Sequence, residues 1–112
     1  MSNFNQVILM GNLTRDPKVA FLPNQTPVVE FGLAVNRKWK KEDGSYGEEV
    51  LYIECVVYGR RAEVINDNFQ KGKPIFVQGR LKLEQWQKDD VTHSRIRVVV
   101  DNFEYVDSKQ GK

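Results

Sequence analysis

The chain has 112 residues, of which 40% are hydrophobic and 29% charged. This length and composition fit one globular domain with a single core and exclude two full domains. The formal net charge of +2 predicts no polyanionic partner, so evidence for one must come from where the charges lie. The single cysteine, Cys55, excludes an internal disulfide and lies in an apolar pattern typical of a buried residue. No signal peptide and no apolar run of ~20 residues is visible, which predicts a cytoplasmic protein without a membrane partner.

The first third of the chain has the pattern of β-strands. Val7–Leu13 is an apolar run that suits a strand and is too short for an independent helix. Gly11 inside it favours a bulge or bend. A short segment at 19–22 follows and ends in a turn at 23–27. Apolar and small or polar residues then alternate over 29–35, as in a half-buried strand.

The middle of the chain predicts a loop, a strand and a helix. Residues 37–49 are polar, contain glycine and lack periodicity, so we expect a long hairpin loop. Residues 51–58 alternate like a strand. Ala62, Ile65 and Phe69 then recur at helical spacing, and Gly72 is the expected stop signal.

The last part predicts a long hairpin. The run at 75–77 suits a strand buried on both faces, and residues 87–94 form a polar tip. Strand alternation should direct five arginine, lysine and tryptophan side chains outward and five apolar side chains toward the core. The outward residues of the two strands include Arg80, Lys82, Trp86, Arg95 and Arg97, and the inward ones are Leu81, Leu83, Ile96, Val98 and Val100.

This order of elements predicts an all-β fold. Five antiparallel strands with one short helix between strands 3 and 4 describe the oligonucleotide-binding (OB) fold, a five-stranded Greek-key barrel, here with a long hairpin between strands 4 and 5. We expect the domain to cover residues 1–106, followed by a short polar tail at 107–112. The phenylalanines are expected in the core: Phe4, Phe21, Phe31, Phe69, Phe76 and Phe103.

Aromatic residues next to cations are the main functional signal. Four are predicted to stack on bases: Trp39, Tyr52, Tyr58 and Trp86. Tyr46 is a weaker candidate, and each ring could instead fill a core or a subunit interface. Strict alternation from Phe31 would turn Trp39 inward, so this prediction assumes that the strand has ended or bulged before Trp39.

The cations predict phosphate contacts that neutralise charge and weaken with salt. The candidates are Arg37, Lys38, Lys40, Lys41, Arg80, Lys82, Arg95 and Arg97. Stacking rings with phosphate-binding cations indicate single-stranded nucleic acid bound without sequence preference. Single-stranded DNA is the expected partner, and RNA is a weaker expectation because only contacts to the 2′-hydroxyl would discriminate.

An enzymatic function finds little support. His93 is the sole histidine and lies in the polar tip without a partner, and Asp89 and Asp90 occupy a normal place for exposed acids. One cysteine and one histidine make a structural zinc site improbable, and there is no phosphate-binding glycine loop. We therefore expect no catalytic residues, no metal and no cofactor.

Four segments in this order and spacing carry a family resemblance: 5–17, 33–39, 54–63 and 71–81 leading to Trp86. Over nearly its whole length the chain resembles the bacterial single-stranded DNA-binding proteins. The resemblance implies a role in DNA replication, recombination and repair, and it matches the same four stacking aromatics. Tyr52 stands where some members carry tryptophan, and Tyr58 where many carry phenylalanine. It also implies a homotetramer, with residues 5–9 and Ile53 as interface candidates.

One departure is the missing linker and acidic tip that usually follow in this family. If 112 residues is the full length, tail-mediated recruitment of repair enzymes is not expected. A replication-restart factor similar to primosomal replication protein N remains an alternative function. A protein-interaction module of the same fold, with Trp39 and Trp86 at an interface, is a second alternative.

Overall fold

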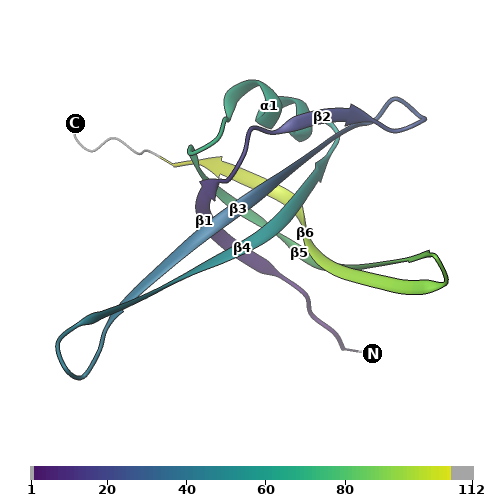
Figure 1. Ribbon diagram of the computed structural model, residues 1–112. Helices are drawn as coiled ribbons and strands as arrows, with labels where there is room; N and C mark the ends of the chain where they lie inside the picture. Colours follow the sequence, from purple (N-terminus) through teal and green to yellow (C-terminus); the bar gives the residue numbers. More distant parts are fainter. Residues whose placement is uncertain (1, 107–112) are drawn as a thin grey trace.

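The computed structural model describes residues 2–106 as one barrel with two long arms (Figure 1). The short polar tail predicted at 107–112 lies outside these residues. The elements are β1 (Val7–Leu13), β2 (Lys18–Phe21), β3 (Pro27–Lys40), β4 (Tyr46–Tyr58), α1 (Arg60–Asn68), β5 (Pro74–Lys88) and β6 (Val91–Tyr105). Within residues 2–106, no helix is long and apolar enough to cross a membrane.

The sheet confirms the predicted OB-fold barrel. Its strand order is β1-β5-β6-β4-β3-β2, and it closes because β1 also pairs with β3. Every pairing is antiparallel except a short parallel one between β4 and β6, which the all-antiparallel prediction missed. The segment predicted at 19–22 is the short strand β2, which pairs along β3.

The core is built from the inward side of these strands. Phe31, Leu33, Cys55 and Val98 are fully buried, as the alternating patterns predict. Helix α1 lies across one end of the barrel, beside β2, and buries Ala62 and Ile65 (Figure 1). The helix ends at Asn68, so the expected stop at residue 72 is in fact part of the following turn.

Two β-ribbons, which we call the β3–β4 arm and the β5–β6 arm, project from the barrel (Figure 1). The long loop predicted at 37–49 is therefore wrong, because β3 runs to Lys40 and β4 begins at Tyr46. The polar segment at 87–94 does form the end of the β5–β6 arm, as predicted. Asp89 and Asp90, with φ of 54° and 64°, make a two-residue turn, and the strands continue on both sides.

The same extension explains which apolar residues lie outside the core. Leu81, Leu83 and Ile96 are 41%, 57% and 56% exposed, although the sequence predicts them inside. They lie on the β5–β6 arm, where no barrel stands beneath the inward side of the strands. Phe4 and Phe21 are likewise exposed and not core residues.

Gly79 lies where the backbones of β5 and β6 approach each other closely, and its substitution tests this contact. It lies at a register shift between β5 and β6, where an added Cβ would overlap the carbonyl oxygen of Val99. Neighbouring backbone cannot rotate away as a side chain can, so we expect Gly79→Ala to lower the free energy of unfolding by about 1–3 kcal/mol. Urea denaturation measures this loss.

Gly44→Asn is the control for that substitution. Gly44 lies in the turn of the β3–β4 arm with φ 91° and with nothing near its Cβ position. Asparagine tolerates this backbone region better than other side chains. If Gly79→Ala unfolded at the same urea concentration as the wild type, the close approach of β5 and β6 at this position would be contradicted.

Candidate nucleic-acid interface

The strands turn one face away from the core, and we call it the outer face. On β4 it carries Tyr52, Glu54 and Tyr58, because their neighbours Ile53, Cys55 and Val57 turn inward. The parallel pairing of Val56 with Val99 continues this face onto β6, where Arg97 belongs to it. Cross-strand pairing continues it further along the β5–β6 arm.

Three of the four predicted stacking residues lie on the outer face. Tyr52 is 71% exposed, Tyr58 40% and Trp86 43%. Tyr52 pairs across the strands with Ala34, whose small side chain leaves the ring open. Trp86 is on the β5–β6 arm and points to the same side of β5 as Lys82 and Glu84. Lys82 pairs across the strands with Arg97, and Glu84 pairs with Arg95. The structure therefore brings these three rings to one surface.

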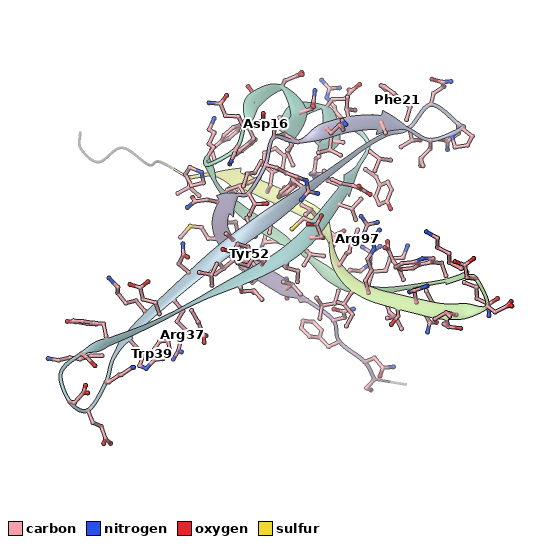
Figure 2. The ribbon with its side chains drawn as sticks, viewed as in Figure 1. Asp16, Phe21, Arg37, Trp39, Tyr52 and Arg97 are labelled. Atoms are coloured by element: carbon pink, nitrogen blue, oxygen red, sulfur yellow. The ribbon has the colours of Figure 1, made fainter. Side chains whose placement is uncertain are left out.

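Trp39 does not join them. Strand β3 neither ends nor bulges before it, so Trp39 stays on the same side as Phe31, contrary to our assumption. It pairs with Gly47, where an added Cβ would come within 2.5 Å of the indole. The Arg37 guanidinium lies 4.8 Å from the ring centroid. Figure 2 shows both residues near the far end of the β3–β4 arm.

Most of the predicted phosphate-binding cations already have carboxylate partners. The ion pairs are Arg37–Glu49 at 3.6 Å, Lys38–Glu48 at 3.7 Å, Arg80–Asp101 at 3.0 Å and Arg95–Glu84 at 2.8 Å. All join neighbouring strands, and their side chains are largely exposed to solvent except that of Glu84, which is 18% exposed. Within residues 2–106, no ion pair engages the other three candidate lysines, Lys40, Lys41 and Lys82.

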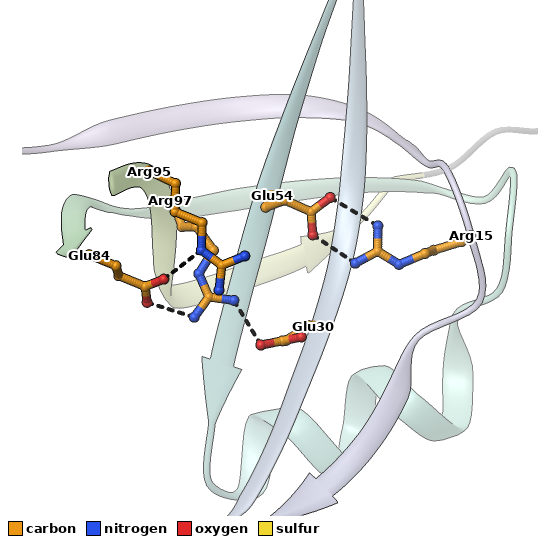
Figure 3. A network of polar contacts seen from close by, with 6 residues as sticks. All are labelled: Arg15, Glu30, Glu54, Glu84, Arg95 and Arg97. Carbon is orange, nitrogen blue, oxygen red and sulfur yellow. Dashed lines mark hydrogen bonds and ion pairs between the residues drawn. The ribbon is translucent and has the colours of Figure 1, made fainter. Parts of the chain in front are cut away.

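Arg97 is the exception among these cations, because its side chain is only 7% exposed. It donates from Nη1 to Glu30 at 2.8 Å and from Nη2 to Glu84 at 2.6 Å (Figure 3). The sequence correctly predicts that it lies on the outer face. However, its guanidinium is buried between two carboxylates, so its primary contacts are structural.

A second pair lies beside this cluster. Arg15 reaches across Gly32 of β3 and binds Glu54 of β4 through two hydrogen bonds of 2.9 and 2.7 Å (Figure 3). Arg15 thereby holds the pKa of Glu54 below its usual range. Hydrogen bonding from Arg97, and then from Arg95, likewise lowers the pKa of Glu84 despite its burial.

The lowered pKa of Glu84 predicts an acid-sensitive contribution to stability. An ionised Glu84 stabilises the fold at pH values above its unfolded-state pKa, and this stabilisation is lost as the pH falls through its lowered folded-state pKa. Glu84→Gln should therefore lower stability at pH 7 but narrow the gap between urea midpoints at pH 7 and pH 3. Asp90→Asn, in the exposed turn, should leave that gap unchanged.

The comparisons with known proteins follow this geometry. Residues 4–106 match the model of the single-strand binding protein family. The chain belongs to this family. It is 43% identical over 107 residues to the single-stranded DNA-binding protein of Helicobacter hepaticus, and 40% identical to that of Wolinella succinogenes. These matches cover 95% of this chain but only 63% and 66% of the two relatives, so the chain spans about two thirds of their length.

Solved structures of the family have the same fold. The single-stranded DNA-binding protein from Thermus aquaticus, as a deletion mutant, superimposes with a TM-score of 0.83 at 32% identity, covering 95% of this chain and 52% of that one. The Plasmodium falciparum protein in complex with single-stranded DNA superimposes with a TM-score of 0.86 at 21% identity. That match covers 96% of this chain and 98% of the other, and it supports the fold alone.

His93 of this family member was considered from the sequence, but its contact with Trp86 was not predicted. His93 pairs across the β5–β6 arm with Trp86, and the two rings stack with centroids 5.6 Å apart and planes 20° apart. Arg95 lies 5.6 Å from the same indole centroid. A two-residue turn at Asp89-Asp90 places residue 93 opposite residue 86, so recognising that turn would have revealed the pair.

Proposed function

We propose that the chain binds single-stranded DNA without reading its sequence. The observation that carries this proposal is the exposure of Tyr52, Tyr58 and Trp86 on one surface of an OB-fold barrel in a single-strand binding family member. Stacking of bases on such rings contributes about 1–3 kcal/mol per base and accepts every base. RNA is a weaker candidate ligand, since stacking and phosphate contacts accept it as well.

The cations divide into two groups in this proposal. Lys40, Lys41 and Lys82 contact phosphates directly, since no intrachain ion pair among residues 2–106 engages them. Four others first exchange a carboxylate for a phosphate: Arg37, Lys38, Arg80 and Arg95. Arg97 makes no phosphate contact in this proposal and instead stabilises the outer face through its ion pairs with Glu30 and Glu84. Trp39 stacks on a base at the side of the β3–β4 arm opposite to the outer face. The bound DNA must therefore wrap around that arm.

We infer a homo-oligomer, with a homotetramer as the preferred state. Two apolar side chains of β1, Ile8 and Met10, are 54% and 56% exposed on the outside of the barrel. Such residues on a strand surface favour burial against another copy. The proposed contacts lie around residues 5–9, and Ile53 is half-buried against the core. A role at the nucleoid in replication, recombination and repair follows from the proposed ligand.

Titration of tryptophan fluorescence with oligo(dT) tests the proposed function. We expect strong quenching by the single strand, little by a duplex of equal length, and lower affinity as salt rises. Trp39→Phe and Trp86→Phe each leave one tryptophan and assign the quenching to one arm. A folded protein that neither quenches nor binds in an independent assay would refute the proposal.

A further inference from the structure

A hollow of about 230 Å³ opens on the outer face beside the aromatic residues described above. Arg15, Lys18, Ala20, Val28 and Glu30 line it. It lies over β2 and β3, on the side of β2 that faces away from α1. None of its apolar residues belongs to the core, so it is a surface feature and not an internal cavity.

The strand register places this hollow next to a stacking residue. Tyr58 pairs with Val28, and Val28 pairs with Ala20, so the three form one row across β4, β3 and β2. Neighbouring strands lie about 4.8 Å apart. The row is therefore a strip in which the Tyr58 ring adjoins a floor of two small apolar side chains. Such a floor accepts the flat face of a base.

The rim of the hollow is cationic. Lys18 pairs across the strands with Glu30, but the Glu30 carboxylate is bound by Arg97 at 2.8 Å. Among residues 2–106, Lys18 makes no ion pair of its own. Arg15 forms the neighbouring wall and is fixed there by Glu54. Thus the one acid in the hollow is already compensated, and the Lys18 ammonium is available to an anion.

We propose that this hollow is a further nucleotide subsite, which extends the path of the bound strand past Tyr58 onto β2. The base lies on the floor of Ala20 and Val28, beside the ring of Tyr58. The adjoining phosphate contacts the Lys18 ammonium. This inference rests on the proposed binding of single-stranded DNA and adds a segment of the path that none of the predicted site residues covers.

Protection of an introduced thiol tests the position of the strand. Cys55 is fully buried, and burial raises its pKa to about 12, so the natural thiol resists alkylation in the folded protein. Ala20→Cys places one exposed thiol on the floor of the hollow. We expect saturating oligo(dT) to slow alkylation of that thiol by at least about tenfold, as expected for a base covering it.

Asp67→Cys provides the matched control, because Asp67 lines a hollow on the α1 side of β2. Its alkylation should be unaffected by oligo(dT). Tryptophan quenching in the same samples reports whether the oligonucleotide is bound. Binding without protection at position 20 overturns the subsite and leaves the proposed function standing. Absence of binding by quenching and by an independent assay overturns both.

Affinity measurements test the role of Lys18 itself. Each phosphate contact to a single strand contributes about 0.7 to the slope of log affinity against log salt. Lys18→Ala should reduce the slope by about that amount for long oligo(dT), and Lys18→Arg should keep the wild-type slope. Oligonucleotides too short to run past Tyr58 should show no difference. The assignment of Lys18 would be overturned if Lys18→Ala kept the wild-type slope for long oligonucleotides. It would also be overturned if Lys18→Ala lowered the slope equally for oligonucleotides of every length.

Discussion

Replacing Tyr52 and Trp86 together with alanine is expected to weaken oligo(dT) binding by about 30-fold to about 20,000-fold. In the proposed function each ring stacks on a base and contributes about 1–3 kcal/mol, and the two losses add when the rings contact different bases. Both side chains are largely solvent-exposed, at 71% and 43%, so the barrel should keep its stability. Anisotropy of a labelled oligonucleotide measures the affinity, and circular dichroism confirms the fold.

Phe21→Ala is the matched control for this double variant. Phe21 is an exposed aromatic residue at 59%, but it lies at the end of β2 on the side facing α1. Its removal should change the affinity by less than a factor of two or so, because no base stacks there. An equal loss of affinity for oligo(dT) in Phe21→Ala and in the double variant would mean that exposed aromatic residues contribute wherever they lie. The outer face would then not be the binding surface.

Arg97→Ala is expected to cause the largest loss of stability among single substitutions on the outer face, about 3 kcal/mol. Arg97 is the common ion-pair partner of Glu84 and Glu30, and its removal takes one ion pair from each. The Glu84 side chain is only 18% exposed, so water replaces the lost contact poorly. Glu84 then keeps only its ion pair with Arg95 among the described residues, and Glu30 loses the ion pair that it makes with Arg97. Urea denaturation at pH 7 measures the effect.

The neighbouring Arg95→Ala supplies the comparison. The Arg95 side chain is 48% exposed and binds the same Glu84, so its loss should cost at most about 1 kcal/mol. Combining Arg97→Ala with Glu84→Gln should recover part of the loss, because the double variant removes the carboxylate charge that has lost its contact with Arg97. Similar losses for the two arginines would show that burial of Arg97 has no energetic consequence.

The barrel could be predicted from the sequence because its strands bury one side. Alternating residues such as Phe31 and Leu33 on β3 indicate a strand wherever a core lies beneath it. The arms lacked this signal. Beyond the barrel both sides of a ribbon meet solvent, so polar residues of 37–49 resembled a loop and Leu83 resembled a core residue. Both misassignments follow from using burial to recognise strands.

For the candidate interface, the sequence indicated which residue types lie on the outer face but not how they are arranged. Aromatic residues beside cations indicated the ligand class, and Tyr52, Tyr58 and Trp86 do lie on one face. The ion-pair partners could not be predicted, because Arg97 and Glu30 are 67 positions apart and meet only when β3, β4 and β6 assemble. The side on which Trp39 lies depended on how far β3 continues, which its polar sequence did not reveal.

The arms also give the molecule two levels of rigidity. A two-stranded ribbon without a core beneath it is marginally stable alone, whereas barrel strands open only with the whole domain. Amide hydrogens near the tips of the arms should therefore exchange with solvent much faster than those of 29–33 or 54–57. Trp39 and Trp86 are attached to the two locally fraying parts, and Tyr58 is attached to the slowly exchanging barrel. If these rings stack on single-stranded DNA as proposed, the two indoles can adjust to a DNA strand that Tyr58 holds in a fixed place.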